Sequence, residues 1–351
     1  MTVKIGVGII GCGVIARRHL NGFLSSPDLC EVRALADPYA EALKSLHQQV
    51  PAATAYVDYH DLLARDDIQV VDVLTPPAIH YSVGCDAIRA GKDLMIIKPF
   101  TTYLGHADEL IALAKSKGVR LMAGQPYRFE PHYQKGVELL RAGRIGRPCR
   151  IYSRGFMRQE WLRKETNWFS NIAISGGITI ENMVHQADLL AWFGGPVDTV
   201  YAVGGTFHTA DWPGGGLPDD QMSILIRFQS GVIGVIEGGT AQPSGMRPTF
   251  MEVVGTEGGI IVERGSLTVG RGVKEREGYL ERFEQGVADR EPAMCRALLE
   301  AVRDGRPAPV PGEVGRYAVE ICWAAILSSR ERQPIKLPLD PAHYPRYEDK
   351  R

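Results

Sequence analysis

Residues Val3–Ala16 read VKIGVGIIGCGVIA, a β-rich apolar run that ends in a glycine-rich turn. A helical pattern follows as far as about Leu24, so the stretch predicts a strand, a tight turn and a helix. Gly11, Gly13 and Ala16 occupy the small positions of the pattern G-x-G-x-x-A. The first permits the turn, the second lets a pyrophosphate approach the backbone, and the third lets helix and strand pack closely. Phosphates would then lie on the backbone N–H groups at the start of the helix.

An acidic residue, Asp37, ends the next predicted strand, Val32–Ala36. It lies about twenty residues past the turn, where a carboxylate can accept the ribose hydroxyls of the adenosine half and repel a 2′-phosphate. The pattern therefore favours NAD over NADP. The competing interpretation is that Asp37 only caps the helix expected over 39–49. Around the turn, the expected cofactor contacts are Gly11, Cys12, Gly13, Val14, Ile15 and Asp37.

Strands and helices keep alternating over the first 125 residues, which predicts an α/β fold with a doubly wound parallel sheet. We expect further helices over 59–64, 79–90 and 104–117, and further strands over 70–74, 94–97 and 120–123. Ligands of such sheets bind outside the carboxyl ends of the strands. The candidate residues at or just after those ends are Gly11, Asp37, Thr75, Lys98 and Gln125.

Lys98 follows the strand 94–97, and Pro99 prevents that strand from continuing. A lysine here can hold a substrate hydroxyl and ease its deprotonation during hydride transfer. Alternatively, it only extends its ammonium group into solvent. His80, in the first turn of its helix, is either a cofactor contact or a structural or capping residue. The expected cofactor contacts along this part of the sheet are Thr75, Pro76, His80, Lys98, Pro99 and Gln125.

The character of the chain changes after a boundary rich in glycine and proline at 143–148. Short β-rich segments separated by glycine-rich turns follow, which predicts an open, mainly antiparallel sheet. A sheet with helices on one face needs cover on the other, so we expect a homodimer or homotetramer through it. The expected organisation is a cofactor-binding domain over 1–125, a substrate-binding and oligomerisation α/β domain over 126–335, and a C-terminal tail over 336–351.

Within the second domain, residues Ser175–Trp192 read SGGITIENMVHQADLLAW. Apolar residues recur at three- and four-residue steps, which predicts one helix with Glu181, His185 and Asp188 on a single face. A histidine exchanges protons near neutral pH, and a carboxylate one turn away can fix its tautomer. The alternative is that both acids are solvated and His185 is a hydrogen-bonded core residue. We expect no metal site, because no second cluster of ligands accompanies this one.

Composition excludes several classes of protein. The chain has 351 residues and a formal net charge of -1, so it lacks the basic surface expected of a nucleic-acid or membrane-surface protein. Its six cysteines include no C-x-x-C pair and are interpreted as reduced thiols. No apolar run is long enough to cross a membrane. Because glycines interrupt the N-terminal apolar run, we interpret it as a strand and turn, not a signal peptide, and expect a cytoplasmic protein.

Taken together, these motifs resemble those of the Gfo/Idh/MocA oxidoreductases, the family of glucose–fructose oxidoreductase and inositol dehydrogenase. The resemblance covers nearly the whole chain and rests on GCGVIA from Gly11, ADP around Asp37, TPP from Thr75, KP from Lys98, YRFEP from Tyr127 and SGGITIENMVHQADLL from Ser175. It implies an N-terminal Rossmann domain, a C-terminal α/β domain, and NAD(P)-dependent oxidation or reduction of one carbinol of a sugar, polyol or inositol. The family's catalytic lysine, aspartate and histidine would correspond to Lys98, Glu181 and His185.

Two positions depart from the pattern of the family. The usual Glu-Lys-Pro is Ile97-Lys98-Pro99 here, which removes a carboxylate near the nicotinamide. The acid four residues before the histidine is Glu181 instead of the usual aspartate, and its extra methylene can change which hydroxyl is presented. Neither change removes Lys98 or His185, so the oxidoreductase hypothesis is kept.

On this hypothesis a ring hydroxyl lies between Lys98 and His185. His185, supported by Glu181, takes the hydroxyl proton while hydride leaves the same carbon for the nicotinamide. The further residues expected to bind the substrate are Tyr127, Trp161, Asn167 and Trp168, although the tryptophans could equally be interface or core residues. Two alternatives remain open: an enzyme whose tightly bound NAD transiently oxidises a ring carbon so that a glycosidic bond is eliminated, and a non-catalytic sugar- or NAD-binding paralogue.

Overall fold

The computed structural model describes residues 4–157, 168–210, 217–240, 249–263, 265–272, 279–284 and 290–344. The chain forms two compact units. The first comprises Met1–Phe129 and Asp289–Arg316, and the second comprises Glu130–Ala288 and Tyr317–Arg351.

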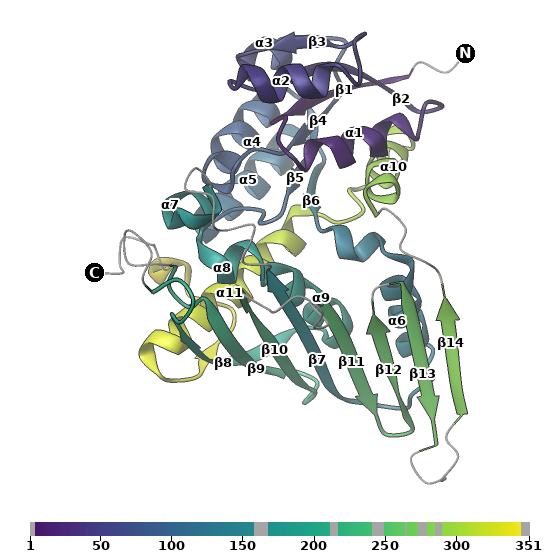
Figure 1. Ribbon diagram of the computed structural model, residues 1–351, viewed down its shortest axis with the longest axis vertical. Coiled ribbons are helices and arrows are strands. Elements are labelled where there is room, and N and C mark those ends of the chain that lie inside the picture. Colours follow the sequence, from purple (N-terminus) through teal and green to yellow (C-terminus); the bar gives the residue numbers. More distant parts are fainter. Residues whose placement is uncertain are drawn as a thin grey trace. The chain divides into compact units, whose positions relative to one another are not determined.

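The first unit contains a parallel sheet of six strands in the order β3-β2-β1-β4-β5-β6 (Figure 1). The strands are β1 (Ile5–Ile10), β2 (Cys30–Ala36), β3 (Thr54–Tyr56), β4 (Val70–Val73), β5 (Asp93–Ile97) and β6 (Leu121–Gly124). The strand order reverses direction between β1 and β4, which is the Rossmann arrangement with its ligand crevice at that point. The predicted doubly wound sheet is therefore confirmed. The short edge strand β3 is one that the sequence pattern did not predict.

Five helices connect these strands: α1 (Ala16–Leu24), α2 (Ala40–His47), α3 (Tyr59–Leu63), α4 (His80–Arg89) and α5 (Leu104–Lys117). Helix α1 lies on one side of the sheet, and α4 and α5 lie on the other (Figure 1). Leu20 and Phe23 of α1, Ile88 of α4 and Leu110 of α5 are almost completely buried in the same core as the strands. The removal of this apolar surface from water stabilises the unit and fixes the strand ends that carry the candidate site.

Helix α10 (Arg290–Arg303) returns from the far end of the sequence to the first unit. It packs against α1 at Gly22, where a methyl group would lie 2.9 Å from both the Glu291 carbonyl oxygen and Cys295 Sγ. The buried residues Met294 and Leu298 join the core of the first unit. The segment 289–316 thus lies outside the unit that we expected over 126–335, because its apolar face is buried against α1.

The second unit contains a mixed sheet of nine strands in the order β14-β13-β12-β11-β7-β10-β9-β8-β15. The strands are β7 (Pro148–Met157), β8 (Val197–Gly205), β9 (Gln221–Phe228), β10 (Ile233–Thr240), β11 (Thr249–Gly255), β12 (Gly258–Glu263), β13 (Ser266–Arg271), β14 (Tyr279–Glu284) and β15 (Ile335–Lys336). Strands β7 and β10 pair in parallel, and the other neighbours pair antiparallel. The sheet is therefore mainly antiparallel, as predicted.

Helices cover one face of this sheet. Helix α6 (Pro131–Arg141) contacts β12 and β13, and α9 (Val184–Gly194) contacts β7 and β10. Residues on the helix side, such as Ile151 and Ile224, are buried, whereas alternate residues on the opposite side, such as Leu225 and Ile233, are exposed. In the described part of the unit, one face of the sheet is covered and the other is open.

The segment that we expected to be a C-terminal tail, 336–351, begins inside the sheet. Strand β15 pairs with β8, and the Leu337 N–H donates to the carbonyl oxygen of Asp198. The Leu339 N–H donates to Glu320 Oε1 of α11 (Gly312–Glu331) at 2.9 Å, and both leucines are buried. The pairing of β15 with β8, these two backbone hydrogen bonds and the two buried leucines therefore attach residues 335–339 to the second unit.

Candidate active site

The glycine turn after β1 has the shape that a dinucleotide needs. Gly11 has a φ of +96°, and a methyl group on it would lie 2.7 Å from the carbonyl carbon and oxygen of Leu74. Only glycine fits this position without strain. At Gly13, in contrast, a methyl group would meet no described atom within 4 Å. The backbone at Gly13 is therefore open to a close approach by a pyrophosphate.

Asp37 holds the turn in place. Its Oδ2 accepts a hydrogen bond from the Cys12 N–H at 2.7 Å, and its Oδ1 accepts one from the Tyr39 N–H at 2.8 Å. The second bond supports the start of α2, so the capping interpretation describes part of its role. A carboxylate has about four lone-pair positions, so two of them remain for ribose hydroxyls. Burial, reinforced by the Asp37 charge, raises the pKa of the Cys12 thiol to about 12, which keeps it protonated.

The start of α1 also fits a dinucleotide. Within the described residues, no side chain caps this helix, and its N-cap residue is Ile15. The backbone N–H groups of the first turn are thus left for an anion, and the helix dipole favours negative charge there. Val14 projects from the same turn with 78% of its surface exposed. Open backbone at Gly13, an uncapped helix and a carboxylate for the ribose together match NAD.

The turns that follow β4, β5 and β6 carry the other expected contacts: Thr75, Pro76, Lys98, Pro99 and Gln125. The Lys98 N–H donates to the Gly124 carbonyl oxygen at 3.3 Å, which extends the pairing of β5 with β6 to the root of the lysine. Gln125 is 99% buried, yet among the described residues neither atom of its side-chain amide has a hydrogen-bond partner, and the same holds for Thr75 Oγ1. Buried polar atoms normally have partners, so these atoms indicate a ligand on this edge of the sheet.

His80 differs from the other expected contacts because its side chain is completely buried. Its Nε2 lies 2.7 Å from the Thr75 carbonyl oxygen, and its Nδ1 lies 2.9 Å from the Pro99 carbonyl oxygen. Both ring nitrogens therefore face backbone atoms of the protein. Of the two roles considered for His80, this geometry supports the structural role over direct contact with a cofactor.

One residue near the glycine turn was not among the expected contacts. Tyr39 lies two positions after Asp37, and 76% of its surface is exposed. The sequence shows it as an aromatic residue two positions after Asp37, the acid expected to bind the ribose. An exposed ring at this position has the chemistry to stack on a flat base.

The prediction of one continuous helix over 175–192 was wrong. The structure has α7 (Ile172–Ser175), α8 (Gly177–Glu181) and α9, and the break between α8 and α9 lies at Asn182 and Met183. Gly176 and Gly177, with φ of +81° and +80°, separate α7 from α8. Met183 is fully buried against Gly238 of β10, where a methyl group would lie 2.8 Å from its side chain. The helix is therefore interrupted where Met183 packs onto the sheet.

Glu181 is consequently the last residue of α8, and His185 is the second residue of α9. Glu181 and Asp188 are each only 2% exposed, so the alternative in which both acids are solvated is wrong. The side chain of His185 is half-buried. Two buried acids close in sequence to a half-buried histidine are expensive to maintain unless they are paired or used, which keeps this segment the candidate proton-handling part of the second unit.

The residues expected to bind substrate have different outcomes. Trp161 and Asn167 lie outside the described residues. Trp168, in the short helix η4 (Trp168–Ser170), stacks on Phe169 with ring centroids 3.9 Å apart. Tyr127, in η2 (Pro126–Phe129), lies beneath the guanidinium group of Arg290 at 4.4 Å from its ring centroid. Its ring is thus partly engaged by the first residue of α10.

No group of three or more His, Cys, Asp or Glu side chains in the described part of the chain is arranged to hold a metal ion. None of the helices described there combines the length and the apolar character needed to cross a membrane.

Comparison with known proteins agrees with this geometry. Residues 5–125 match the model of an oxidoreductase family with an NAD-binding Rossmann fold, and residues 133–261 match the GFO/IDH/MocA C-terminal domain. The chain is 26% identical to the myo-inositol 2-dehydrogenase of Thermotoga maritima over 342 residues, which are 94% of this chain and 98% of that protein. It is 24% identical to the scyllo-inositol 2-dehydrogenase (NAD(+)) of Bacillus subtilis over 347 residues, 98% of this chain and 99% of that protein.

Among solved structures, levoglucosan dehydrogenase in complex with NADH has the same fold, with a TM-score of 0.89 at 19% identity. The match covers 96% of this chain and 100% of that one. The fold and the glycine turn define an NAD-binding oxidoreductase. The chain belongs to the GFO/IDH/MocA family. Its relatives include named inositol dehydrogenases, which supports the hypothesis of an oxidoreductase enzyme.

Proposed function

We propose that the protein transfers a hydride between one carbinol of a sugar, inositol or related polyol and NAD. The observation that carries this proposal is the position of Lys98, which directly follows β5 on the sheet edge that also carries the open Gly13 backbone and Asp37. The named activities of the inositol dehydrogenase relatives support a polyol as the class of substrate.

In this proposal, Lys98 and His185 handle the proton of the reacting hydroxyl. The ammonium group of Lys98 donates to the hydroxyl oxygen and stabilises the negative charge that develops as the proton leaves. His185 accepts that proton, and the buried Glu181 supports the charged imidazole. NAD supplies the hydride acceptor, and the residues of the chain supply orientation and charge.

The cofactor side of the proposal assigns Gly11, Gly13 and Asp37 to the adenosine and pyrophosphate half. Thr75 and Gln125, whose buried polar atoms have no partner among the described residues, are assigned to the nicotinamide half. The exposed ring of Tyr39 is assigned to the adenine. These assignments follow the rule that ligands of doubly wound sheets bind at the carboxyl ends of the strands.

The test is the appearance of NADH absorbance when purified protein is mixed with NAD and a panel of inositols, aldoses, anhydrosugars and glycosides. Lys98→Met should lower kcat by about a hundredfold or more, because an organised proton-transfer group contributes roughly that much. Lys115→Met, on an exposed position of α5, is the matched control. Activity of Lys98→Met equal to that of the control would refute the assignment. Cleaved glycosides without net NADH, from protein that retains NAD on purification, would instead support transient ring oxidation.

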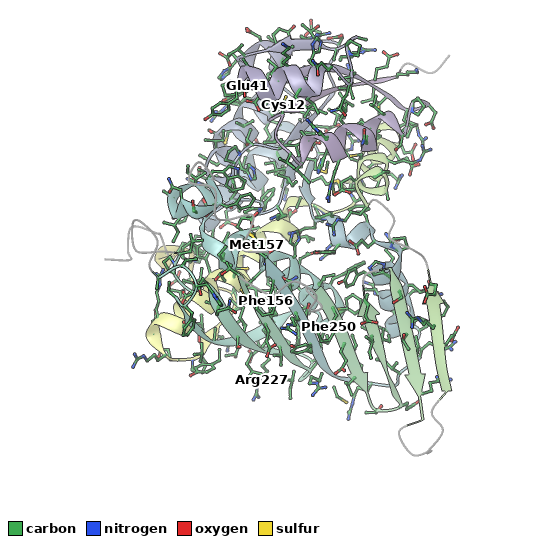
Figure 2. The ribbon with its side chains drawn as sticks, viewed as in Figure 1. Cys12, Glu41, Phe156, Met157, Arg227 and Phe250 are labelled. Atoms are coloured by element: carbon green, nitrogen blue, oxygen red, sulfur yellow. The ribbon has the colours of Figure 1, made fainter. Side chains whose placement is uncertain are left out.

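We also propose that the open face of the nine-stranded sheet binds a second copy of the chain. That face carries Leu225 and Ile233, which are about half exposed, together with Phe156, Phe250 and Arg227, which Figure 2 shows on β7, β11 and β9. The face also carries charges of both signs, including the Arg150–Glu252 ion pair at 2.6 Å. A face with mixed charges and apolar residues can complement itself across a two-fold axis.

The oligomer is tested by light scattering coupled to size-exclusion chromatography. Leu225→Glu should shift the protein to a smaller species, because it places a charge on an apolar position of the proposed interface. Leu24→Glu changes an exposed leucine of the first unit and serves as the control. A monomeric wild-type protein, or an unchanged mass for Leu225→Glu, would contradict this interface.

A further inference from the structure

His80 connects two turns that lie next to each other on the cofactor edge of the first unit. It is the first residue of α4, and its side chain has no exposed surface. Its Nε2 lies 2.7 Å from the carbonyl oxygen of Thr75, in the turn after β4. Its Nδ1 lies 2.9 Å from the carbonyl oxygen of Pro99, in the turn after β5.

The chemistry of these contacts is unusual because a carbonyl oxygen only accepts hydrogen bonds. A neutral imidazole has one N–H group and can donate to one of the two turns, whereas an imidazolium can donate to both. The two carbonyl oxygens therefore favour the charged ring. Burial, and to a smaller extent the ammonium group of Lys98, oppose it, and together they hold the pKa of His80 below its usual value of 6.5.

Each of the two turns carries a residue of the proposed active site. Thr75 follows β4, and its buried hydroxyl has no partner among the described residues. Pro99 directly follows Lys98, so the position of its carbonyl group also sets where the Lys98 side chain begins. A change in the distance between the two turns would move Lys98 with respect to Thr75.

We propose that His80 is a positioning residue that packs between the Thr75 turn and the Pro99 turn, donates its N–H to one of them, and so fixes the backbone from which Lys98 acts. The proposal rests on the proposed role of Lys98. The alternative expectation for His80 was direct contact with a cofactor. The structure argues against that contact, because the ring is completely buried and both of its nitrogens face backbone carbonyl oxygens, so no polar atom is left for a ligand.

The kinetic test compares His80→Phe, which keeps a ring but removes both nitrogens, with His80→Gln, whose side-chain amide can still donate to a carbonyl oxygen. His47→Phe is the matched control, because His47 also contacts one backbone carbonyl, that of Ala53 at 2.8 Å, but lies on α2. We expect His80→Phe to lower kcat by about tenfold or more, since a small misplacement of a catalytic group costs that much. His80→Gln should restore part of the loss.

The affinity for NADH should change by less than about threefold in both His80 variants, because the adenosine half is assigned to Gly13 and Asp37, and neither ring nitrogen of His80 faces these residues. This separation of kcat from cofactor affinity distinguishes positioning from a general loss of structure. The proposal is overturned if folded His80→Phe has a kcat within twofold of wild type, or if kcat and NADH affinity fall together with the melting temperature.

A second measurement does not depend on activity. In ¹⁵N-edited NMR of the wild-type protein, a ring N–H of His80 should be resolved and protected from exchange with solvent, and His80→Phe should lack that signal. Rapid exchange of the ring proton would overturn the tie between the turns. Failure of the proposed function would look different: the protected signal would be present, but Lys98→Met would retain full turnover.

Discussion

The Oδ2 atom of Asp37 accepts a hydrogen bond from the backbone N–H of Cys12 at 2.7 Å. This contact joins the acid at the end of β2 to the second residue of the glycine turn that follows β1. The same carboxylate accepts the Tyr39 N–H through Oδ1, so it orders both sides of the crevice. A group that shapes the turn and, in the proposed function, also offers its remaining lone pairs to a ribose should affect cofactor affinity more than an ordinary surface acid would.

Asp37→Asn should therefore weaken NADH binding by about tenfold or more, because hydrogen bonds to a charged group contribute roughly 1.5–3 kcal/mol each. Binding of NADPH should weaken less or improve, since the charge that repels a 2′-phosphate is removed. Fluorescence titration with both cofactors measures the two affinities. Asp28→Asn, which changes an exposed acid paired with Arg296, is the control. Equal losses for the two cofactors would contradict the proposed discrimination.

Gly13→Ala should reduce cofactor affinity without unfolding the protein. A methyl group there meets no described atom within 4 Å, so the free energy of unfolding should stay within about 1 kcal/mol of wild type. The added methyl group would occupy the space through which a pyrophosphate approaches the backbone. The measurement is a pair of experiments, thermal unfolding without cofactor and NADH titration. A normal NADH affinity would show that the pyrophosphate does not approach Gly13.

Gly11→Ala should have the opposite result, a loss of stability even without cofactor. The left-handed φ of +96° costs a residue with a side chain about 1–2 kcal/mol, and contact with the Leu74 carbonyl at 2.7 Å adds to that cost. Gly91→Ala is the matched control, since Gly91 has a φ of +71° but open space around it. Urea unfolding should rank the stabilities as wild type, then Gly91→Ala, then Gly11→Ala. Equal losses for the two alanines would mean that the contact with Leu74 relaxes without cost.

The sequence predicted the first unit well because its signals are local. A strand, the glycine turn, Asp37 and the turns at Thr75 and Lys98 each follow from a few neighbouring residues, and the rule for parallel sheets places them on one edge. The short strand β3 was missed because three residues carry too little pattern. NAD as the cofactor was also predicted correctly, from the turn and Asp37, and the family match over residues 5–125 supports it.

The remaining errors come from contacts between segments that are distant in sequence. The packing of Met183 against Gly238 and the left-handed glycines interrupt a pattern that looks helical throughout. The packing of α10 against α1 brings together Gly22 and Glu291, which are more than 260 residues apart in the chain. Burial of Glu181 and Asp188 likewise depends on the surrounding fold. Periodicity of a single segment contains none of this information.

The pKa of His80 predicts how stability depends on pH. In the folded protein burial holds this pKa below the value of 6.5 expected when the chain is unfolded, so the unfolded state binds more protons between the two values. The contribution of His80 to stability is therefore fully present above about pH 6.5 and is lost as the pH falls through the folded pKa, by at most about 1.4 kcal/mol per pH unit. Urea unfolding of wild type and His80→Gln between pH 7.5 and 5 measures it. An identical pH dependence in the two proteins would contradict this assignment.

Replacement of His185 should separate catalysis from cofactor binding. His185→Ala removes the proposed proton acceptor, so turnover should fall by about two to four orders of magnitude. Affinity for NADH should stay close to that of wild type, because the glycine turn and Asp37 belong to the first unit and His185 belongs to the second. His208→Ala, which removes an exposed histidine of the second unit, is the control. If His185→Ala lost NADH binding or unfolded, while His208→Ala behaved normally, His185 would be a structural residue and the general base would have to be sought elsewhere.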